Sequence, residues 1–156
     1  MNYLLGIDFG GGASKATLLR EDGVICAEHT VEYPTYYDER GGCEQSGEDW
    51  IAALCQGTSA TLQKSGVAPE SIAAVAIDSA THTSLVCDAD MRPLRRAMHW
   101  TDTRSRAEAA ELLASHGDLI FEKTYHKPDT IWTLPQLLWL KRHEGERFER
   151  IRYVFF

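Results

Sequence analysis

The first third of the chain alternates short apolar runs with turn residues, which is the pattern of a β-meander. Strands are predicted over residues 3–9, 14–20 and 24–32. A turn-forming Glu-Asp-Gly sequence at residues 21–23 separates the second run from the third. We therefore expect these three strands to pair as antiparallel neighbours.

A helix is expected after the meander. Residues 33–45 are polar and are predicted as a loop. Ser46 and Asp49 resemble a capping box, which starts a helix that runs to about Lys64. Gly66 then ends it. This helix is a candidate for the crossover connection between the meander and the next strand.

Further strands are predicted in the middle of the chain. The Ala/Val/Ile run at 72–78 has the composition and length of a buried strand. Residues 82–87 are predicted as another strand that ends at the Asp-Ala-Asp turn at 88–90, and residues 97–100 as one more.

The last third changes to helical spacing. From Ser105 onward, apolar residues recur at helical intervals: Ala107, Ala110, Leu113 and Ala114. A second helical segment follows Pro128, and Pro135 either begins its helix or kinks it. One face of that segment contains Ile131, Leu134, Leu138 and Trp139. Residues 151–156 are aromatic and β-prone, so a final strand is expected there.

This order of elements predicts an α/β fold. A strand meander, a crossover helix, and then further strands and helices are the layout of a ribonuclease-H-like domain with a mixed central sheet flanked by helices. The first hairpin of such a domain would carry Asp8.

Composition narrows the class of protein. The 156 residues are 44% hydrophobic and 10% aromatic, which predicts one compact domain with a core. Sixteen basic and 23 acidic residues give a net charge of −7, and no Lys/Arg block is long enough to follow a nucleic-acid backbone. No apolar stretch approaches the roughly 20 residues of a membrane span, and no signal peptide is evident. A cytoplasmic protein without nucleic-acid or membrane partners is expected.

Neither cysteines nor histidines indicate a metal site. The four cysteines are widely spaced without a Cys-x-x-Cys pair, which favours free thiols. The six histidines have no ligand spacing.

The turn after the first strand has the chemistry of a phosphate site. It contains a carboxylate, three glycines, a hydroxyl and a cation: Asp8, Gly10, Gly11, Gly12, Ser14 and Lys15. Without a Cβ, glycine N–H groups can approach an anion closely, and a lysine can neutralise its charge. A carboxylate repels phosphate unless a cation lies between them, and Mg²⁺ is the natural mediator. The alternative is a tight hairpin turn with no ligand.

Five short motifs occur along the chain, and their order and spacing together indicate a protein family more specifically than any single motif does. They are Gly6-Ile7-Asp8-Phe9-Gly10, Glu44-Gln45 followed by Asp49-Trp50, Thr81-His82, Trp100-x-Asp102-x-Arg104 and Leu137-Leu138-Trp139-Leu140-Lys141. Together they resemble the amino-terminal domain of the FGGY carbohydrate kinases, over nearly the whole chain. The family often has threonine where this chain has Gly11, so a hydroxyl contact to phosphate or to metal-bound water is missing.

The resemblance implies an actin-like ATPase fold and an ATP-dependent sugar kinase. Residues 1–156 would form the amino-terminal, sugar-binding domain of a two-domain enzyme. The second domain, the general base and most of the adenosine pocket would lie outside this chain, which alone would be inactive. Asp8 would orient Mg²⁺–ATP, often through water. The phosphates would be bordered by the backbone of residues 10–12 and by Lys15.

The resemblance also indicates which residues contact the sugar. Thr81 and His82 would hydrogen-bond its hydroxyls, although xylulokinase-like members have Met where this chain has Thr81. Trp100 would stack on the carbon skeleton, Asp102 would accept from hydroxyls, and Arg104 would hold Asp102 in a bidentate pair. Their i, i+2, i+4 spacing would place these three side chains on one side of an extended segment.

Structural interpretations remain open at the same positions. Trp100 could lie in the core, with Thr103 or Asp102 as a helix cap. His82 could be a hydrogen-bonded loop or core histidine. Trp132 and Trp139, at helical spacing, are assigned to core packing.

The motifs favour a ketopentose such as xylulose as substrate. Gluconate or another polyol is the alternative within the family. Outside the family, one alternative is a sensor that binds a sugar without transferring phosphate. Another is a ribonuclease-H-type nuclease, which could use Asp8, Asp78 and Asp88 as metal ligands. The sequence leaves the oligomeric state open, a homodimer included.

Overall fold

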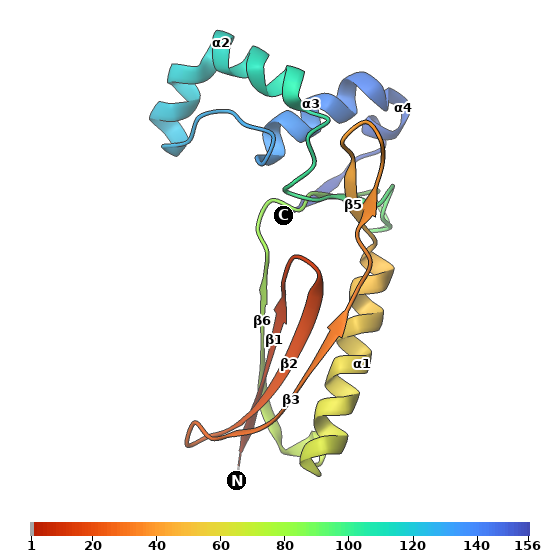
Figure 1. Cartoon of the computed structure of the whole chain (residues 1–156), viewed down its shortest axis with the longest axis vertical. Helices are drawn as coiled ribbons and strands as arrows, with labels where there is room; N and C mark the ends of the chain where they lie inside the picture. The colour runs from red at the N-terminus through yellow and green to blue at the C-terminus, as the bar shows by residue number, and fades with distance from the viewer. Residues whose placement is uncertain (1) are drawn as a thin grey trace. The chain divides into compact units, whose positions relative to one another are not determined.

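A computed structural model describes residues 2–156, which fold as two compact units (Figure 1). The first unit contains the chain up to Pro34 and Glu48–Ala80, and the second contains Thr35–Gly47 and Thr81–Phe156. Each unit has its own cluster of buried apolar residues. The assignment of residues 1–156 to one domain of a larger protein stays a prediction.

A four-stranded mixed sheet forms the first unit, in the order β3-β2-β1-β6. β1 (Tyr3–Phe9), β2 (Ala13–Arg20) and β3 (Ile25–Glu32) pair as antiparallel neighbours. β6 (Ile72–Ser79) pairs with β1 in parallel. The predicted meander and the mixed sheet are confirmed.

The parallel β1–β6 pair needs a crossover, which α1 (Gly47–Ser65) and a short 3₁₀ turn, η1 (Pro69–Ser71), provide. α1 runs along one face of the sheet (Figure 1). Its Thr61 hydroxyl donates to the Ala16 carbonyl at 3.3 Å. The core of the unit contains Leu5, Ile7, Ala16 and Leu18, against which Leu54 and Leu62 pack.

β6 is not the buried strand that its apolar sequence predicts. All its residues after Ile72 are exposed, and 64% of Ile77 is accessible to solvent. The reason is topological, because β6 is the outermost strand of the sheet and the core is built on β1 and β2.

Two small sheets and three helices form the second unit. One sheet has the order β4-β5-β8, and the other pairs β7 with β9. The strands are β4 (Tyr36–Tyr37), β5 (Cys43–Gln45), β7 (Leu85–Cys87), β8 (Ala97–Met98) and β9 (Tyr153–Phe155). The helices are α2 (Arg106–Thr124), α3 (Thr133–His143) and α4 (Gly145–Phe148).

The core of the second unit contains Val86, Met98, Trp139 and Leu140. The core assignment of Trp139 is therefore confirmed. Pro135 lies in the first turn of α3, where its missing N–H costs nothing, so the helix begins there and is not kinked by it. β9 confirms the strand predicted at the end of the chain.

Three predictions in this unit are wrong in extent. The strand expected at 82–87 is limited to β7, and the one at 97–100 to β8. His82 has a left-handed backbone (φ 59°), and the Asp102 N–H donates to the His99 carbonyl in a turn, so neither segment stays extended. The predicted loop at 33–45 contains β4 and β5, which are too short to show a period in the sequence.

All four cysteines are free, as predicted. Within residues 2–156, no helix has the length and apolar character needed to cross a membrane.

Candidate functional site

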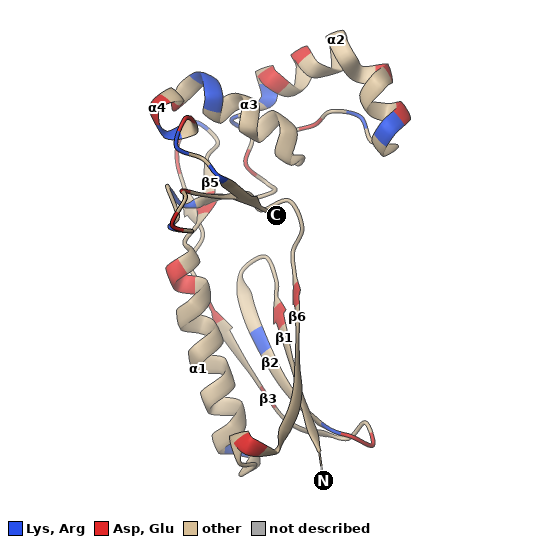
Figure 2. Ribbon diagram, turned by 180° about the vertical axis from the view of Figure 1, so that it is seen from behind, with Lys and Arg blue, Asp and Glu red and all other residues tan. Residues whose placement is uncertain are grey.

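Asp8 lies near the exposed end of β1, in the first unit. Across the sheet it is in register with Lys15 of β2 on one side and Asp78 of β6 on the other. Residues in register on neighbouring strands share a face of the sheet. The sheet therefore places a cation and two carboxylates in one row, and Figure 2 shows the acidic positions of β1 and β6 next to each other.

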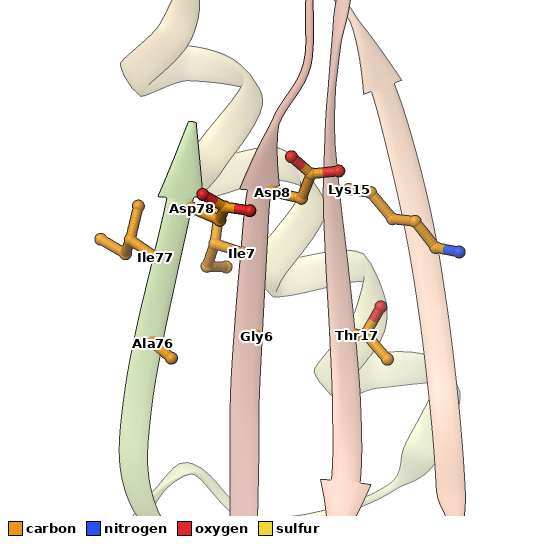
Figure 3. Close-up of a pocket in the computed structure, with 8 residues that line it drawn as sticks. All are labelled: Gly6, Ile7, Asp8, Lys15, Thr17, Ala76, Ile77 and Asp78. Atoms are coloured by element: carbon orange, nitrogen blue, oxygen red, sulfur yellow. The ribbon is translucent and has the colours of Figure 1, made fainter. Parts of the chain in front are cut away.

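An open pocket of about 270 Å³ lies over this row (Figure 3). It is lined by Gly6, Ile7, Asp8, Lys15, Thr17, Ala76, Ile77 and Asp78. In Figure 3 the two carboxylates lie beside each other, whereas the Lys15 ammonium extends away from Asp8. Lys15 Nζ instead lies 3.0 Å from Glu28 Oε2, in a partly exposed ion pair. The structure thus places Lys15 at the pocket but directs its charge elsewhere.

The chemistry of this pocket fits Mg²⁺. Neighbouring carboxylates destabilise each other's charge unless a cation lies between them. Both Asp8 and Asp78 are exposed, and carboxylate oxygens are the ligands that Mg²⁺ prefers. Asp78 Oδ1 also accepts the Ser79 N–H at 2.9 Å, which helps to hold its carboxylate in place. Asp8 and Asp78 are the residues of this unit that would hold the ion.

The glycine turn that follows Asp8 is fixed by Tyr33. The Gly10 N–H donates to the Ala13 carbonyl at 2.9 Å, and the Tyr33 N–H donates to the Gly12 carbonyl at 3.0 Å. The buried Tyr33 side chain donates its hydroxyl to the Gly10 carbonyl. Burial raises the pKa of Tyr33, and the negative charge of Asp8 raises it further. Tyr33 therefore stays protonated as a donor at neutral pH and belongs to the same local environment as Asp8.

The glycines and Ser14 of the predicted phosphate turn differ in the structure from what the sequence predicts. None of its three glycines has a positive φ, so the turn does not depend on a left-handed backbone. A Cβ at Gly12 would meet nothing within 4 Å, which leaves room for a ligand. Ser14 is buried on β2, so its side chain is not presented at the turn surface.

The sugar-binding candidates belong to the second unit. Thr81 is exposed and His82 is half-buried, both in the turn before β7. The His82 ring makes an edge contact with Trp132, with ring centroids 4.5 Å apart, and its Nδ1 lies 3.4 Å from the Thr133 hydroxyl. Trp132 immediately precedes α3 and is half-buried, with its indole against the ring of a candidate site residue.

Trp100, Asp102 and Arg104 do not share one side of an extended segment. The turn after β8 separates them, because the Asp102 N–H donates back to the His99 carbonyl at 2.9 Å. Trp100 is 43% exposed and lies against the His99 ring, whereas none of Asp102 is exposed. Only the indole of Trp100 remains at the surface for a ligand.

The Asp102 carboxylate is used within the protein. It accepts the Cys43 N–H at 2.8 Å, the Arg104 N–H at 3.0 Å, and three hydrogen bonds from Nε and Nη2 of the Arg104 guanidinium, the shortest at 2.6 Å. The bidentate Asp102–Arg104 pair that the resemblance implies is therefore present. Burial disfavours the charge of Arg104, but its hydrogen bonds with Asp102 and Glu44 outweigh that effect and raise its pKa.

A second buried arginine joins this pair into a network. Glu44 accepts hydrogen bonds from both Arg104, at 2.7 Å, and Arg95. Arg95 also donates to Glu144 at 2.6 Å, and burial lowers its pKa against the opposing charges of the two glutamates. The Arg104 guanidinium lies 4.7 Å from the ring centroid of Trp139, at cation–π distance. The network anchors the 100–104 turn to β5, α3 and the start of α4.

The loop before β5 closes on the same turn. Gly41 has φ +89°, and a Cβ there would approach the Thr103 hydroxyl oxygen to 2.3 Å. The Thr103 N–H donates to the Gly41 carbonyl at 3.0 Å. Glycine is thus required at position 41 for the backbones to meet.

The sequence did not indicate the site roles of three residues: Tyr33, Arg95 and Trp132. Asp78 was named together with Asp8 only as a metal ligand under the nuclease alternative. Asp78 carried a usable signal, since a carboxylate at the end of a strand parallel to β1 reaches the same sheet edge as Asp8. Tyr33, Arg95 and Trp132 carried none, because tertiary pairing alone defines their roles.

Comparisons with known proteins agree with this architecture. Residues 3–156 match the model of the amino-terminal domain of the FGGY family of carbohydrate kinases. A xylulose kinase of Bacillus subtilis is 31% identical over 150 residues, covering 96% of this chain and 30% of the relative. A glycerol kinase of Xanthobacter autotrophicus is 37% identical over 124 residues, covering 78% of the chain and 25% of the relative.

A solved crystal structure also has the same fold as this chain. The crystal structure of a xylulose kinase from Brucella ovis superposes with a TM-score of 0.94 at 30% identity, covering 99% of this chain and 32% of that one. The fold is therefore the actin-like ATPase fold of these kinases. The chain spans about 30% of the length of the xylulose kinase relatives named here.

Proposed function

The chain belongs to the FGGY family of carbohydrate kinases, and from this premise we propose that it takes part in ATP-dependent phosphorylation of a sugar hydroxyl. A ketopentose such as xylulose is the substrate that we propose, supported by the similarity to two xylulose kinases. The observation that carries the proposal is the exposed Asp8–Asp78 pair in a pocket beside the glycine turn. Mg²⁺ neutralises phosphate charge when bound there with ATP.

The proposed roles are those that the family resemblance implies, and the positions of the side chains support some of them. Asp8 orients the Mg²⁺–ATP complex, and the backbone of residues 10–12 borders the phosphates. Lys15 reaches them only by leaving Glu28, an exchange that costs little because exposed ion pairs contribute about 0–1 kcal/mol. In the second unit, Thr81, His82 and Trp100 contact the sugar, and Asp102 with Arg104 positions the turn that carries Trp100.

Residues 1–156 are proposed as the sugar-binding domain of a two-domain kinase. The general base and most of the adenosine pocket then lie outside this chain, so a coupled ADP-release assay on the chain alone should show no turnover above background. Brisk turnover would contradict this part of the proposal. ATP dependence and four free thiols are consistent with the cytoplasm as the compartment of the reaction.

Sugar binding tests the proposal directly. A thermal-shift panel with xylulose, ribulose, gluconate and glycerol should give the largest rise in apparent stability with xylulose, because a ligand that binds the folded state stabilises it. Trp100→Ala should remove the rise, and Asp8→Asn, which lies in the first unit, should keep it. A rise with gluconate or glycerol alone would identify the alternative polyol substrate, for which the glycerol kinase relative is the supporting observation.

A further inference from the structure

Two hydroxyl side chains form a hydrogen-bonded chain that ends at His82 within the second unit. The Ser84 hydroxyl donates to Thr133 Oγ1 at 3.2 Å, and Thr133 Oγ1 lies 3.4 Å from His82 Nδ1. Ser84 is buried just before β7, and Thr133 is the first residue of α3. Two segments about 50 residues apart in sequence therefore converge on one nitrogen of the imidazole.

Donation in the order Ser84 to Thr133 to His82 is compatible with one neutral tautomer of the ring. A hydroxyl has one hydrogen to donate and lone pairs to accept with. Since Thr133 accepts from Ser84, its own hydrogen is available for His82 Nδ1. A neutral imidazole that accepts at Nδ1 carries its hydrogen on Nε2.

The backbone and ring contacts of His82 restrain the same side chain. Its φ of 59° is in the left-handed region, which non-glycine residues occupy at an energetic cost and often at functional sites. Trp132 meets the ring nearly at right angles (86°), and the His126 ring packs against the same indole at 4.3 Å between centroids. The Phe156 ring also stacks parallel to the imidazole, with ring centroids 6.1 Å apart, so rotation of the imidazole is restricted by both aromatic neighbours.

We propose that Thr133 is a positioning residue, supported by Ser84, that holds His82 in the Nε2–H tautomer, and that Trp132 fixes the orientation of the ring. His82 then presents Nε2–H as a donor for a ligand oxygen, which suits a sugar carbonyl or hydroxyl. The ligand part of this inference rests on the proposed function, whereas the tautomer part does not.

The tautomer can be read directly from ¹⁵N–¹H long-range correlation spectra of the ¹⁵N-labelled chain. In the wild type, His82 should show the Nε2–H pattern. Thr133→Val keeps the shape of the side chain and removes the hydroxyl, so the Nδ1–H form should become populated. Thr133→Ser keeps the hydroxyl and should retain the wild-type pattern. A wild-type Nδ1–H pattern, or no change in Thr133→Val, overturns the inference.

Sugar titration of the same samples separates the two proposals. Xylulose should shift the His82 Nε2 resonance, and Thr133→Val should weaken binding about threefold to tenfold, the effect of one net hydrogen bond. Thr133→Ser is the matched control and should bind like the wild type. If the tautomer results hold while no sugar of the panel shifts Nε2, the sugar-kinase proposal fails and the positioning role of Thr133 stands. If xylulose shifts Nε2 equally in all variants, with no change of tautomer, Thr133 has no positioning role.

Discussion

Removing the charge of Asp102 should unfold the second unit more readily instead of merely weakening ligand binding. Asp102→Asn keeps the size of the side chain but replaces one acceptor oxygen by an NH₂ donor. The wild-type carboxylate has no exposed surface and accepts hydrogen bonds from the Cys43 N–H, the Arg104 N–H and the Arg104 guanidinium. In the variant, the new NH₂ group faces N–H groups that donated to the wild-type carboxylate, so hydrogen bonds are lost. The Arg104 side chain, which is only 5% exposed, then keeps Glu44 as its main counter-charge.

The size of the effect follows from burial. Breaking a buried ion pair by removing one partner costs about 3–5 kcal/mol. Domains are typically stable by about 5–15 kcal/mol, so this loss would be a large part of the total. With a urea m-value of about 2 kcal/mol/M, the unfolding midpoint should fall by roughly 2 M. Urea titration followed by circular dichroism measures this shift.

The control is an ion pair at the surface. Glu122→Gln removes the partner of Lys123 at a site where both side chains are about two-thirds exposed, and it should change the free energy of unfolding by less than about 1 kcal/mol. A second variant, Arg104→Met, should make Asp102→Asn less costly than it is in the wild type, because the two side chains interact directly. An Asp102→Asn variant with wild-type stability and lost xylulose binding would refute the reasoning and restore Asp102 as a sugar ligand.

Three further predictions concern the other unit and the pH dependence. Tyr33→Phe removes the hydroxyl that donates to the Gly10 carbonyl and should lower the free energy of unfolding by about 1–2 kcal/mol in urea; an unchanged midpoint would contradict this. Gly57 lies within α1, and an alanine there would place its Cβ 3.7 Å from Ala16 Cβ and Val31 Cγ2, which is ordinary contact. Because alanine favours the helix more than glycine does, Gly57→Ala should raise the urea midpoint of unfolding by the equivalent of about 0.5–1 kcal/mol, and a lower midpoint would contradict this. Burial lowers the pKa of His99 against the opposing charge of Asp102, so the unfolded chain binds this proton first. Stability should therefore decline as pH falls from about 6.5 to 5, by at most about 1.4 kcal/mol per unit, and His99→Gln should flatten that slope.

The elements with strong local patterns could be predicted from the sequence. The meander, the crossover helix and the final strand each contain enough residues for a period of two or 3.6 to appear, and the structure places them at or within one or two residues of the expected bounds. β4, β5 and β8 have two or three residues each, so their existence depends on pairing partners distant in sequence. Composition indicated how apolar β6 is, but only the strand order reveals that it is outermost.

The candidate sites divide in the same way. Asp8 and the glycines are contiguous, so one short motif was enough to identify them. Trp100, Asp102 and Arg104 were identified by the resemblance to a family motif, and their spacing could not tell that a turn would bury one of them and expose another. The contacts of Thr133 with His82, and of Arg95 with Glu44, join segments about 50 residues apart, and no local pattern encodes such pairs.

The exposed border formed by β6 has a consequence for handling the chain in solution. A long apolar strand with unpaired backbone groups along one side can serve as a template for a strand of another molecule. Neither lysine nor proline interrupts its Ile-Ala-Ala-Val-Ala-Ile stretch, and these are the residues that commonly block such growth. Concentrated samples should therefore form β-rich oligomers by edge-to-edge addition, and a lysine in place of Val75 should act as a gatekeeper that suppresses them.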